Sequence, residues 1–81
     1  MKIYKVYRDF SDPYEQSYKD YGYYLSKEKA IKELERIVRE EESEDFDESK
    51  LDYLREYGAY GIEWLGYYGI SEIYVNDEVT K

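Results

Sequence analysis

Hydrophobic and charged residues alternate through the first part of the chain, and this period-two pattern predicts strands. In residues 2–8, KIYKVYR, branched and aromatic side chains alternate with basic ones, as expected of a strand with one buried face. Residues 9–19 include Pro13, the only proline, and are typical of a turn or loop. Residues 21–25, YGYYL, predict a second strand, in which Gly22 marks either a bulge or a point of close approach. We expect the two strands to pair as an antiparallel hairpin.

The pattern then changes to the three- and four-residue spacing of an amphipathic helix. Ser26 is a favourable N-cap, and Glu28 lies in the first turn, where the helix dipole favours an anion. The hydrophobic residues that follow fill one helical face: Ala30, Ile31, Leu34, Ile37 and Val38. The sequence therefore predicts a helix that covers one face of the sheet.

A second, shorter helix is predicted after residue 48. Ser49 begins a capping box in its Asp variant, which makes Ser49 the expected N-cap. Leu51, Leu54 and Tyr57 then share one helical face. Gly58 follows at the position where a glycine commonly ends a helix.

Glycines divide the remaining segment, AYGIEWLGYYGISEIYVNDEV, into short pieces. Two strands, near residues 60–68 and 72–79, are the first interpretation, and a helical turn around residues 62–65 is the competing one. At 81 residues, we expect one domain spanning residues 1–81. The order ββααββ predicts an α+β fold, a small and mostly antiparallel sheet with one long and one short helix on one face.

Three segments carry a resemblance to other proteins. The opening MKIYKVY, residues 24–30 (YLSKEKA) and the closing EIYVND resemble short uncharacterised proteins of bacteriophages and low-GC bacteria, in which a strand pair runs into a helix that begins Ser-x-Glu-Lys-Ala. The resemblance covers about half the chain and leaves out the acidic and tyrosine-rich segments. It implies no reaction and no functional residues. It does imply a phage or mobile-element accessory protein, a setting in which small acidic proteins often inhibit host defence or host enzymes.

Composition adds an unusual supply of tyrosine. Hydrophobic residues make up 42% of the chain, and thirteen of them are tyrosines. A domain of this size buries only about 60% of the surface of its unfolded chain, so it cannot hide that many rings. Exposed tyrosine is enriched at protein interfaces, because it joins a large apolar ring to a polar hydroxyl.

The missing residue types exclude several kinds of chemistry. The chain has no Cys and no His, which removes disulfides, thiolate nucleophiles, the usual general base and the commonest metal ligand. We therefore expect no enzymatic activity, no cofactor and no metal site. The opening MKIYKVYRDF has charges within each apolar run, unlike a signal peptide, and no run approaches the roughly 20 apolar residues of a membrane span. We expect a soluble, cytoplasmic protein.

Negative charge is concentrated in the second half of the chain. Residues 1–39 carry nine Lys and Arg against seven Asp and Glu, a net charge of +2, whereas residues 40–81 carry three against thirteen, a net charge of −10. Seven acids lie within nine residues at 40–48, EEESEDFDE. Such a surface repels nucleic acid and anionic lipid and attracts basic proteins.

The acidic stretch is open to other interpretations. Asp45, Asp47 and Glu56 match ligand positions of an EF-hand calcium loop, but Lys50 replaces the glycine of the sharp turn. A weak cation site at these acids therefore stays an alternative. A pair of catalytic carboxylates needs a cleft, which so small a chain can hardly build. Direct nucleic-acid binding by stacked tyrosines lacks a basic track in the tail.

We expect the acidic, tyrosine-rich half to bind the basic surface of a host protein, such as a nucleic-acid-binding enzyme or a defence protein, and to inhibit it. Nucleic-acid mimicry is one form that this inhibition can take. The acidic stretch taken alone is also consistent with an ordinary interface or with a solvated loop. The predicted contact residues combine the acids with aromatic anchors: Glu41, Glu42, Glu44, Asp45, Phe46, Asp47, Glu48, Tyr53, Tyr57, Tyr60, Trp64, Tyr67 and Tyr68. Two alternatives remain open. One is a homo-oligomer, a homodimer for instance, that sequesters a small molecule such as a nucleotide, and the other is a structural or assembly component.

Overall fold

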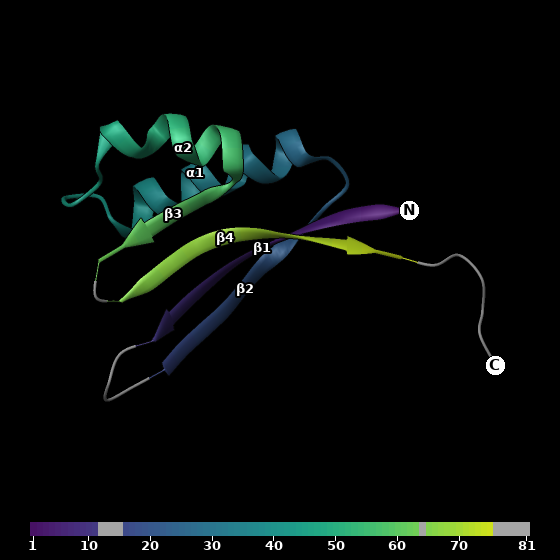
Figure 1. Cartoon of the computed structure of the whole chain (residues 1–81), viewed down its shortest axis with the longest axis horizontal. Coiled ribbons are helices and arrows are strands. Elements are labelled where there is room, and N and C mark those ends of the chain that lie inside the picture. The colour runs from purple at the N-terminus through teal and green to yellow at the C-terminus, as the bar shows by residue number, and fades with distance from the viewer. Residues whose placement is uncertain (12–15, 64, 76–81) are drawn as a thin grey trace.

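The computed structural model describes residues 1–11, 16–63 and 65–75 and contains one sheet and two α-helices (Figure 1). Along the chain these elements are β1 (Lys2–Ser11), β2 (Gln16–Tyr24), α1 (Lys27–Glu41), the 3₁₀ turn η1 (Glu48–Lys50), α2 (Leu51–Tyr57), β3 (Ala59–Ile62) and β4 (Gly66–Tyr74). The α+β class and the order of strands and helices are as predicted. Helix α1 has 15 residues and α2 has 7.

The four strands form an antiparallel sheet in the order β2-β1-β4-β3. Strand β1 lies inside the sheet and pairs with β2 on one side and with β4 on the other, so the first and last described strands are neighbours. Figure 1 shows both helices on the same side of this sheet. One face of the sheet is therefore covered, and the other is not covered by either helix.

The amino-terminal hairpin is longer than its sequence pattern suggests. Strand β1 extends to Ser11 and β2 begins at Gln16, so much of the segment predicted as loop is strand. The reason is tertiary, because β4 pairs with β1 as far as Phe10, opposite Gly66. The predicted bulge is confirmed, since the β1–β2 register shifts as the chain passes Gly22.

The tail departs from the first interpretation, because residues 60–68 are not one strand. Strand β3 ends at Ile62 and β4 begins at Gly66. Between them the Leu65 N–H donates a hydrogen bond to the Ile62 carbonyl over 3.2 Å, which closes a turn where the competing interpretation placed a helical turn. Gly66 permits this turn with a φ of 147°, a value that other residues rarely adopt. Residues 76–79 of the second predicted strand lie outside the described residues.

Helix α1 agrees closely with its sequence pattern. The Ser26 hydroxyl accepts a hydrogen bond from the Lys29 N–H over 3.2 Å, as expected of an N-cap. Four of the five residues predicted for its apolar face are buried, and the fifth, Ile31, is half-buried: the buried ones are Ala30, Leu34, Ile37 and Val38. Periodicity and capping are local properties, which is why the sequence alone locates this helix.

The start of the second helix differs from the prediction. Ser49 is not the N-cap, because the Asp47 carboxylate takes that role for η1 and accepts both the backbone N–H and the hydroxyl of Ser49, at 3.0 and 2.6 Å. An ionised carboxylate is the stronger acceptor, so Ser49 acts as a donor instead. The predicted end is confirmed, since Gly58 adopts a left-handed conformation with φ 69° and ψ 40°.

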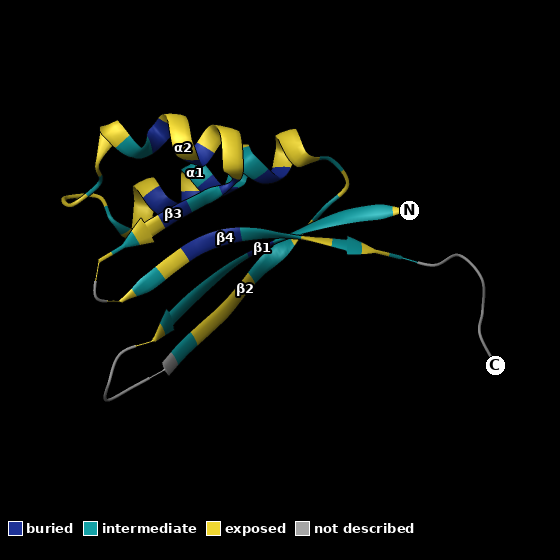
Figure 2. Cartoon of the chain, viewed as in Figure 1, coloured by how far each residue is buried: buried dark blue, intermediate teal, exposed yellow. Residues whose placement is uncertain are grey.

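The core lies between the helices and the covered face of the sheet. Its buried residues come from α1, α2 and three strands: Val6, Ala30, Leu34, Ile37, Val38, Leu54, Tyr60 and Tyr68. Figure 2 shows the buried segments of β4 and of both helices, with exposed residues on the outer sides of the helices. No helix among the described residues is long and apolar enough to cross a membrane.

Candidate protein-binding surface

The acidic stretch spans two kinds of structure. Glu40 and Glu41 belong to the last turn of α1, and the following acids lie in the loop that leads into η1. Because a helix turns about 100° per residue, neighbouring acids at its end point in different directions. The exposed Glu40 pairs with Arg36 along the outer side of the helix at 3.0 Å, while Glu41 faces the sheet.

Glu41 joins α1 to three strands. Its carboxylate accepts hydrogen bonds from the hydroxyls of Tyr21 and Tyr68, at 2.6 and 3.1 Å, and from the Arg8 guanidinium at 2.9 Å. Partial burial alone would raise the pKa of Glu41, but these hydrogen bonds and the charge of Arg8 outweigh it and lower that pKa below its usual value. Glu41 is therefore an ion that stabilises the fold.

Glu42 is also engaged within the chain. Its carboxylate lies 2.8 Å from the Tyr68 hydroxyl, whose single proton is therefore shared between Glu42 and Glu41. Burial raises the pKa of Tyr68, and the two neighbouring carboxylates raise it further, because each disfavours a phenolate. The Tyr68 ring is fully buried, so this hydroxyl holds the end of α1 against β4 from inside the core.

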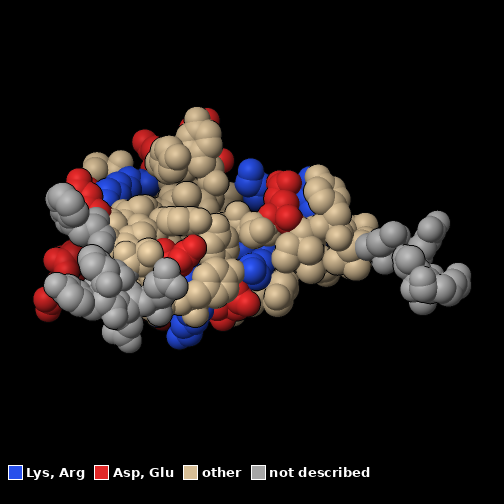
Figure 3. Space-filling model, turned by 60° about the horizontal axis from the view of Figure 1, so that its bottom comes forward, with Lys and Arg blue, Asp and Glu red and all other residues tan. Residues whose placement is uncertain are grey.

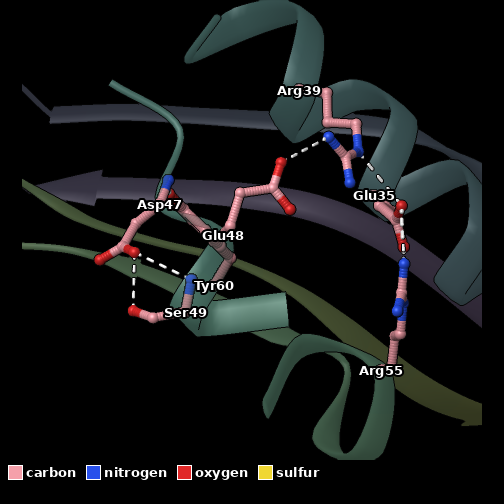
Figure 4. Close-up of polar contacts among 7 residues, drawn as sticks. All are labelled: Glu35, Arg39, Asp47, Glu48, Ser49, Arg55 and Tyr60. Carbon is pink, nitrogen blue, oxygen red and sulfur yellow. Dashed lines mark hydrogen bonds and ion pairs between the residues drawn. The ribbon is translucent and has the colours of Figure 1, made fainter. Parts of the chain in front are cut away.

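A network of ion pairs connects both helices to the acidic loop (Figure 4). Glu35 accepts hydrogen bonds from Arg55 of α2 at 3.0 Å and from Arg39 at 3.1 Å. The hydrogen bond from Arg55 is the main reason that the pKa of Glu35 is lowered. Arg39 also donates to Glu48, at 3.1 Å, so part of the predicted contact surface is neutralised by a residue of α1.

Phe46 attaches the acidic loop to the core. Its ring stacks on Tyr60 with a centroid distance of 5.5 Å and an interplanar angle of 4°, and the Arg39 guanidinium covers it at 4.6 Å. The Tyr60 hydroxyl accepts the N–H of Asp47 at 2.8 Å, which fixes the loop beside η1. The Asp47 side chain bonds Ser49, and this lowers the pKa of Asp47. Phe46 therefore has a structural role in the loop.

The remaining acids surround a groove. Glu42, Asp45, Asp47 and Glu63 line a hollow of about 480 Å³ together with Lys50, Tyr60, Ile62 and Leu65. Within the described residues, the side chains of Glu44, Asp45 and Glu63 have no ion pair or hydrogen bond. Lys50 lies between this acidic groove and a neighbouring, mainly apolar hollow of about 490 Å³, and donates to the Gly61 carbonyl at 2.9 Å. The exposed ring of Tyr53 lines that second hollow.

The predicted aromatic anchors do not form one surface. Tyr60 and Tyr68 are at most 1% exposed, so they are core residues and are too buried to contact a partner as predicted. Tyr67 lies on the uncovered face of the sheet, because side chains alternate along β4 and Tyr68 points to the core. Tyr53 and Tyr57 are exposed on α2, with ring centroids 4.6 Å apart. Trp64 lies outside the described residues.

Several residues of the groove were missed by the sequence reasoning. Glu63, Ile62 and Leu65 reach it through the β3–β4 turn, which depends on strand pairing between distant segments. The structural roles of two residues outside the groove, Glu41 and Arg8, were also missed, although the sequence carried a signal for each. Glu41 continues the buried stripe of Leu34, Ile37 and Val38 at helical spacing, and Arg8 shares a strand face with Val6 and Phe10, where a charge needs a partner.

The cation site considered from the sequence has no support in the geometry. Among the described residues, no group of three or more acids is arranged to hold a metal ion. Asp47 is occupied with capping η1, and Glu56 lies on α2.

Comparison with protein-family models, with curated proteins and with solved structures finds no match to this chain.

Proposed function

We propose that this chain binds the basic surface of another protein through the acidic groove and the loop beside it, and that it thereby inhibits a nucleic-acid-binding or defence protein. The observation that carries the proposal is the groove itself, which four carboxylates line together with one cation, Lys50, and with uncharged side chains, so that its lining is net negative. Carboxylates that form no ion pair within the chain are available to another protein, whereas those already paired with a cation of the chain are not. The proposal therefore rests on Glu44, Asp45 and Glu63, with Glu42 and Asp47 contributing their unused lone pairs.

The chemistry of the groove suits a lysine or arginine side chain. Both have an apolar stem and a charged end group, so the stem can lie on Ile62 and Leu65 while the end group meets the carboxylates. The ion pair between a carboxylate and an arginine is often bidentate, with two parallel hydrogen bonds that make the attraction directional. Tyr53, in the adjoining hollow, supplies an apolar contact beside the charged one.

Nucleic-acid mimicry is the form of inhibition that this surface favours. Duplex DNA carries one negative charge per roughly 1.7 Å of its axis, and basic clefts that bind DNA are matched to that density. Residues 40–81 carry a net charge of −10, which the +2 of residues 1–39 does not balance. A basic cleft would be attracted over a distance, and the attraction would weaken as salt screens it.

The test compares two variants of equal net charge. In the first, the available acids of the groove region are neutralised, as Glu44→Gln, Asp45→Asn and Glu63→Gln. In the control, three acids on other surfaces are neutralised, as Glu28→Gln, Glu33→Gln and Glu72→Gln. Glu41, Glu42 and Asp47 stay unchanged because they stabilise the fold. Each tagged protein is incubated with bacterial lysate, and captured proteins are identified after low-salt and high-salt washes.

We expect the wild type and the control to retain a nucleic-acid-binding protein at low salt and to lose it at high salt, with added duplex DNA competing for it. The groove variant should retain much less, at least about tenfold for three lost charge contacts. Equal capture by the groove variant and the control would show that net charge alone is responsible. Capture that resists both salt and DNA would refute the mimic.

A further inference from the structure

The uncovered face of the sheet carries a cluster of tyrosines. Strand alternation places Tyr7, Tyr18, Tyr23 and Tyr67 on it, opposite the helices. Three of these rings are strongly exposed, with Tyr18 at 54%, Tyr23 at 58% and Tyr67 at 42%. In the part of the chain that the structure describes, neither helix covers this face.

Charged residues are scarce there. The positions on this face are the odd-numbered ones in β1, β3 and β4 and positions 18, 20 and 23 in β2, fourteen positions with described side chains. Three of these fourteen positions are charged, Lys5, Asp9 and Asp20, whereas 40% of the residues in the whole chain are charged. Lys5 pairs with Asp20 at 3.5 Å. Depletion of charge together with enrichment of tyrosine is the composition of an interface centre.

The tyrosines are ordered by contacts within the chain. Tyr7 stacks on Tyr18 with a centroid distance of 5.7 Å and meets Tyr67 edge-on at 5.9 Å. The Lys5 ammonium lies over Tyr7 and Tyr18, at 5.6 and 5.2 Å. Tyr7 also covers Gly69 so closely that a Cβ there would meet its hydroxyl at 3.0 Å. Rings already held in place lose little entropy on binding, which favours association.

The size and charge of the face fit a second copy of the same chain. Three strands of nine or ten residues and the short β3 give a footprint of roughly 500 Å² at the usual strand spacing, so two faces bury about 1,000 Å², near the lower limit for a specific interface. The face carries a net charge of only −1 of the total −8, because the acidic stretch begins on the helix side. Figure 3, from below the view of Figure 1, shows a largely neutral surface with scattered charges.

We infer that two copies of this chain associate face to face through this tyrosine cluster. Antiparallel sheets pack in this way about 10 Å apart, and a two-fold axis lets the same face serve both copies. The acidic grooves stay outside the interface, so the dimer would present two of them. This inference concerns a different surface from the groove and does not depend on the proposed function.

The test measures self-association by sedimentation from micromolar to millimolar concentration. We expect a dimer whose affinity rises with salt, because salt screens the repulsion between two acidic chains, whereas binding to a basic partner weakens with salt. Tyr18→Lys should weaken the dimer at least about tenfold, since the change occurs twice in a symmetric interface. Tyr53→Lys is the matched control, with a ring of similar exposure, 58%, on α2. A wild type that stays monomeric throughout would overturn the inference, as would equal effects of the two variants.

Cross-linking locates the contact independently of affinity. The chain has no cysteine, so a single introduced one can form disulfides only between copies. Ser71 lies near the middle of the uncovered face, opposite Lys5, and Ser43 lies in the acidic loop. Under mild oxidation we expect Ser71→Cys to give a covalent dimer and Ser43→Cys to give far less. The reverse order would place the contact elsewhere.

Discussion

Neutralising Glu41 tests the idea that this acid of the 40–48 stretch stabilises the fold, whereas the neighbouring Glu40 does not. Glu41→Gln keeps the shape of the side chain but replaces one oxygen by an N–H₂ group. Arg8 donates to Oε1 at 2.9 Å and Tyr21 donates to Oε2 at 2.6 Å, so the amide loses one of these two acceptors and leaves the other without its charge. Among the described residues, the buried Nε atom of Arg8 has no hydrogen-bond partner, so this guanidinium depends on Glu41 and on Ser17, at 3.0 Å, for its hydrogen bonds.

The expected loss is worked from these contacts. A hydrogen bond to a charged group contributes about 1.5–3 kcal/mol, and two of them are weakened here. The Glu41 side chain is 28% exposed and its Arg8 partner 22%, so water offsets part of the loss. We expect the free energy of unfolding to fall by about 2 kcal/mol, a large share of the roughly 4–12 kcal/mol expected for a chain of this length.

Glu40→Gln is the matched control, since it removes the same charge one residue away. Glu40 is 66% exposed and pairs with Arg36, which is 53% exposed and keeps its bonds to Glu33. Such a surface pair contributes about 0.5 kcal/mol or less.

The assay is urea unfolding at neutral pH, followed by circular dichroism. With a denaturant slope of about 1 kcal/mol per molar urea, Glu41→Gln should lower the midpoint by about 2 M and Glu40→Gln by less than about 0.5 M. Similar small shifts for both variants would refute the reasoning, because they would mean that the bonds to Arg8 and Tyr21 contribute no more than an exposed ion pair.

Two further predictions concern acid stability and the β3–β4 turn. The pKa of Glu41 is lowered from its usual value of 4.5, so the stabilisation that its carboxylate gives is complete above pH 4.5 and is lost as the pH falls through the folded-state pKa. The free energy of unfolding, measured in urea, should therefore decline less steeply below about pH 5 in Glu41→Gln than in the wild type. Parallel declines would contradict this. Gly66→Ala should cost about 2 kcal/mol or more in thermal unfolding, because φ is 147° and a Cβ would collide with the Asp9 carbonyl, whereas Gly61→Ala, with open space around its Cβ, should change stability by less than about 1 kcal/mol. Equal melting temperatures for these two variants would show that the turn tolerates a side chain.

Local features of the fold were predictable because neighbouring residues create them. Helix α1 follows from hydrophobic spacing and from Ser26, and the end of α2 follows from Gly58. The bulge at Gly22 belongs to the same class. The cap at Asp47 was missed because the capping-box pattern indicated Ser49, whereas the ionised carboxylate two residues earlier is the stronger acceptor.

The full length of β1 and β2 could not be predicted from the sequence, because it depends on pairing with a distant strand. The residues of β1 and β2 do not themselves indicate that pairing.

The acidic stretch shows the same limit. By itself the sequence determined that this half of the chain is strongly negative, rich in tyrosine and without Cys or His. Only the tertiary structure decided that Glu41, Glu42 and Asp47 are engaged within the chain, and that Asp45 and Glu63 line a groove. The physical reason is that charge is a property of composition, whereas the availability of a charge depends on which distant side chains the fold brings beside it.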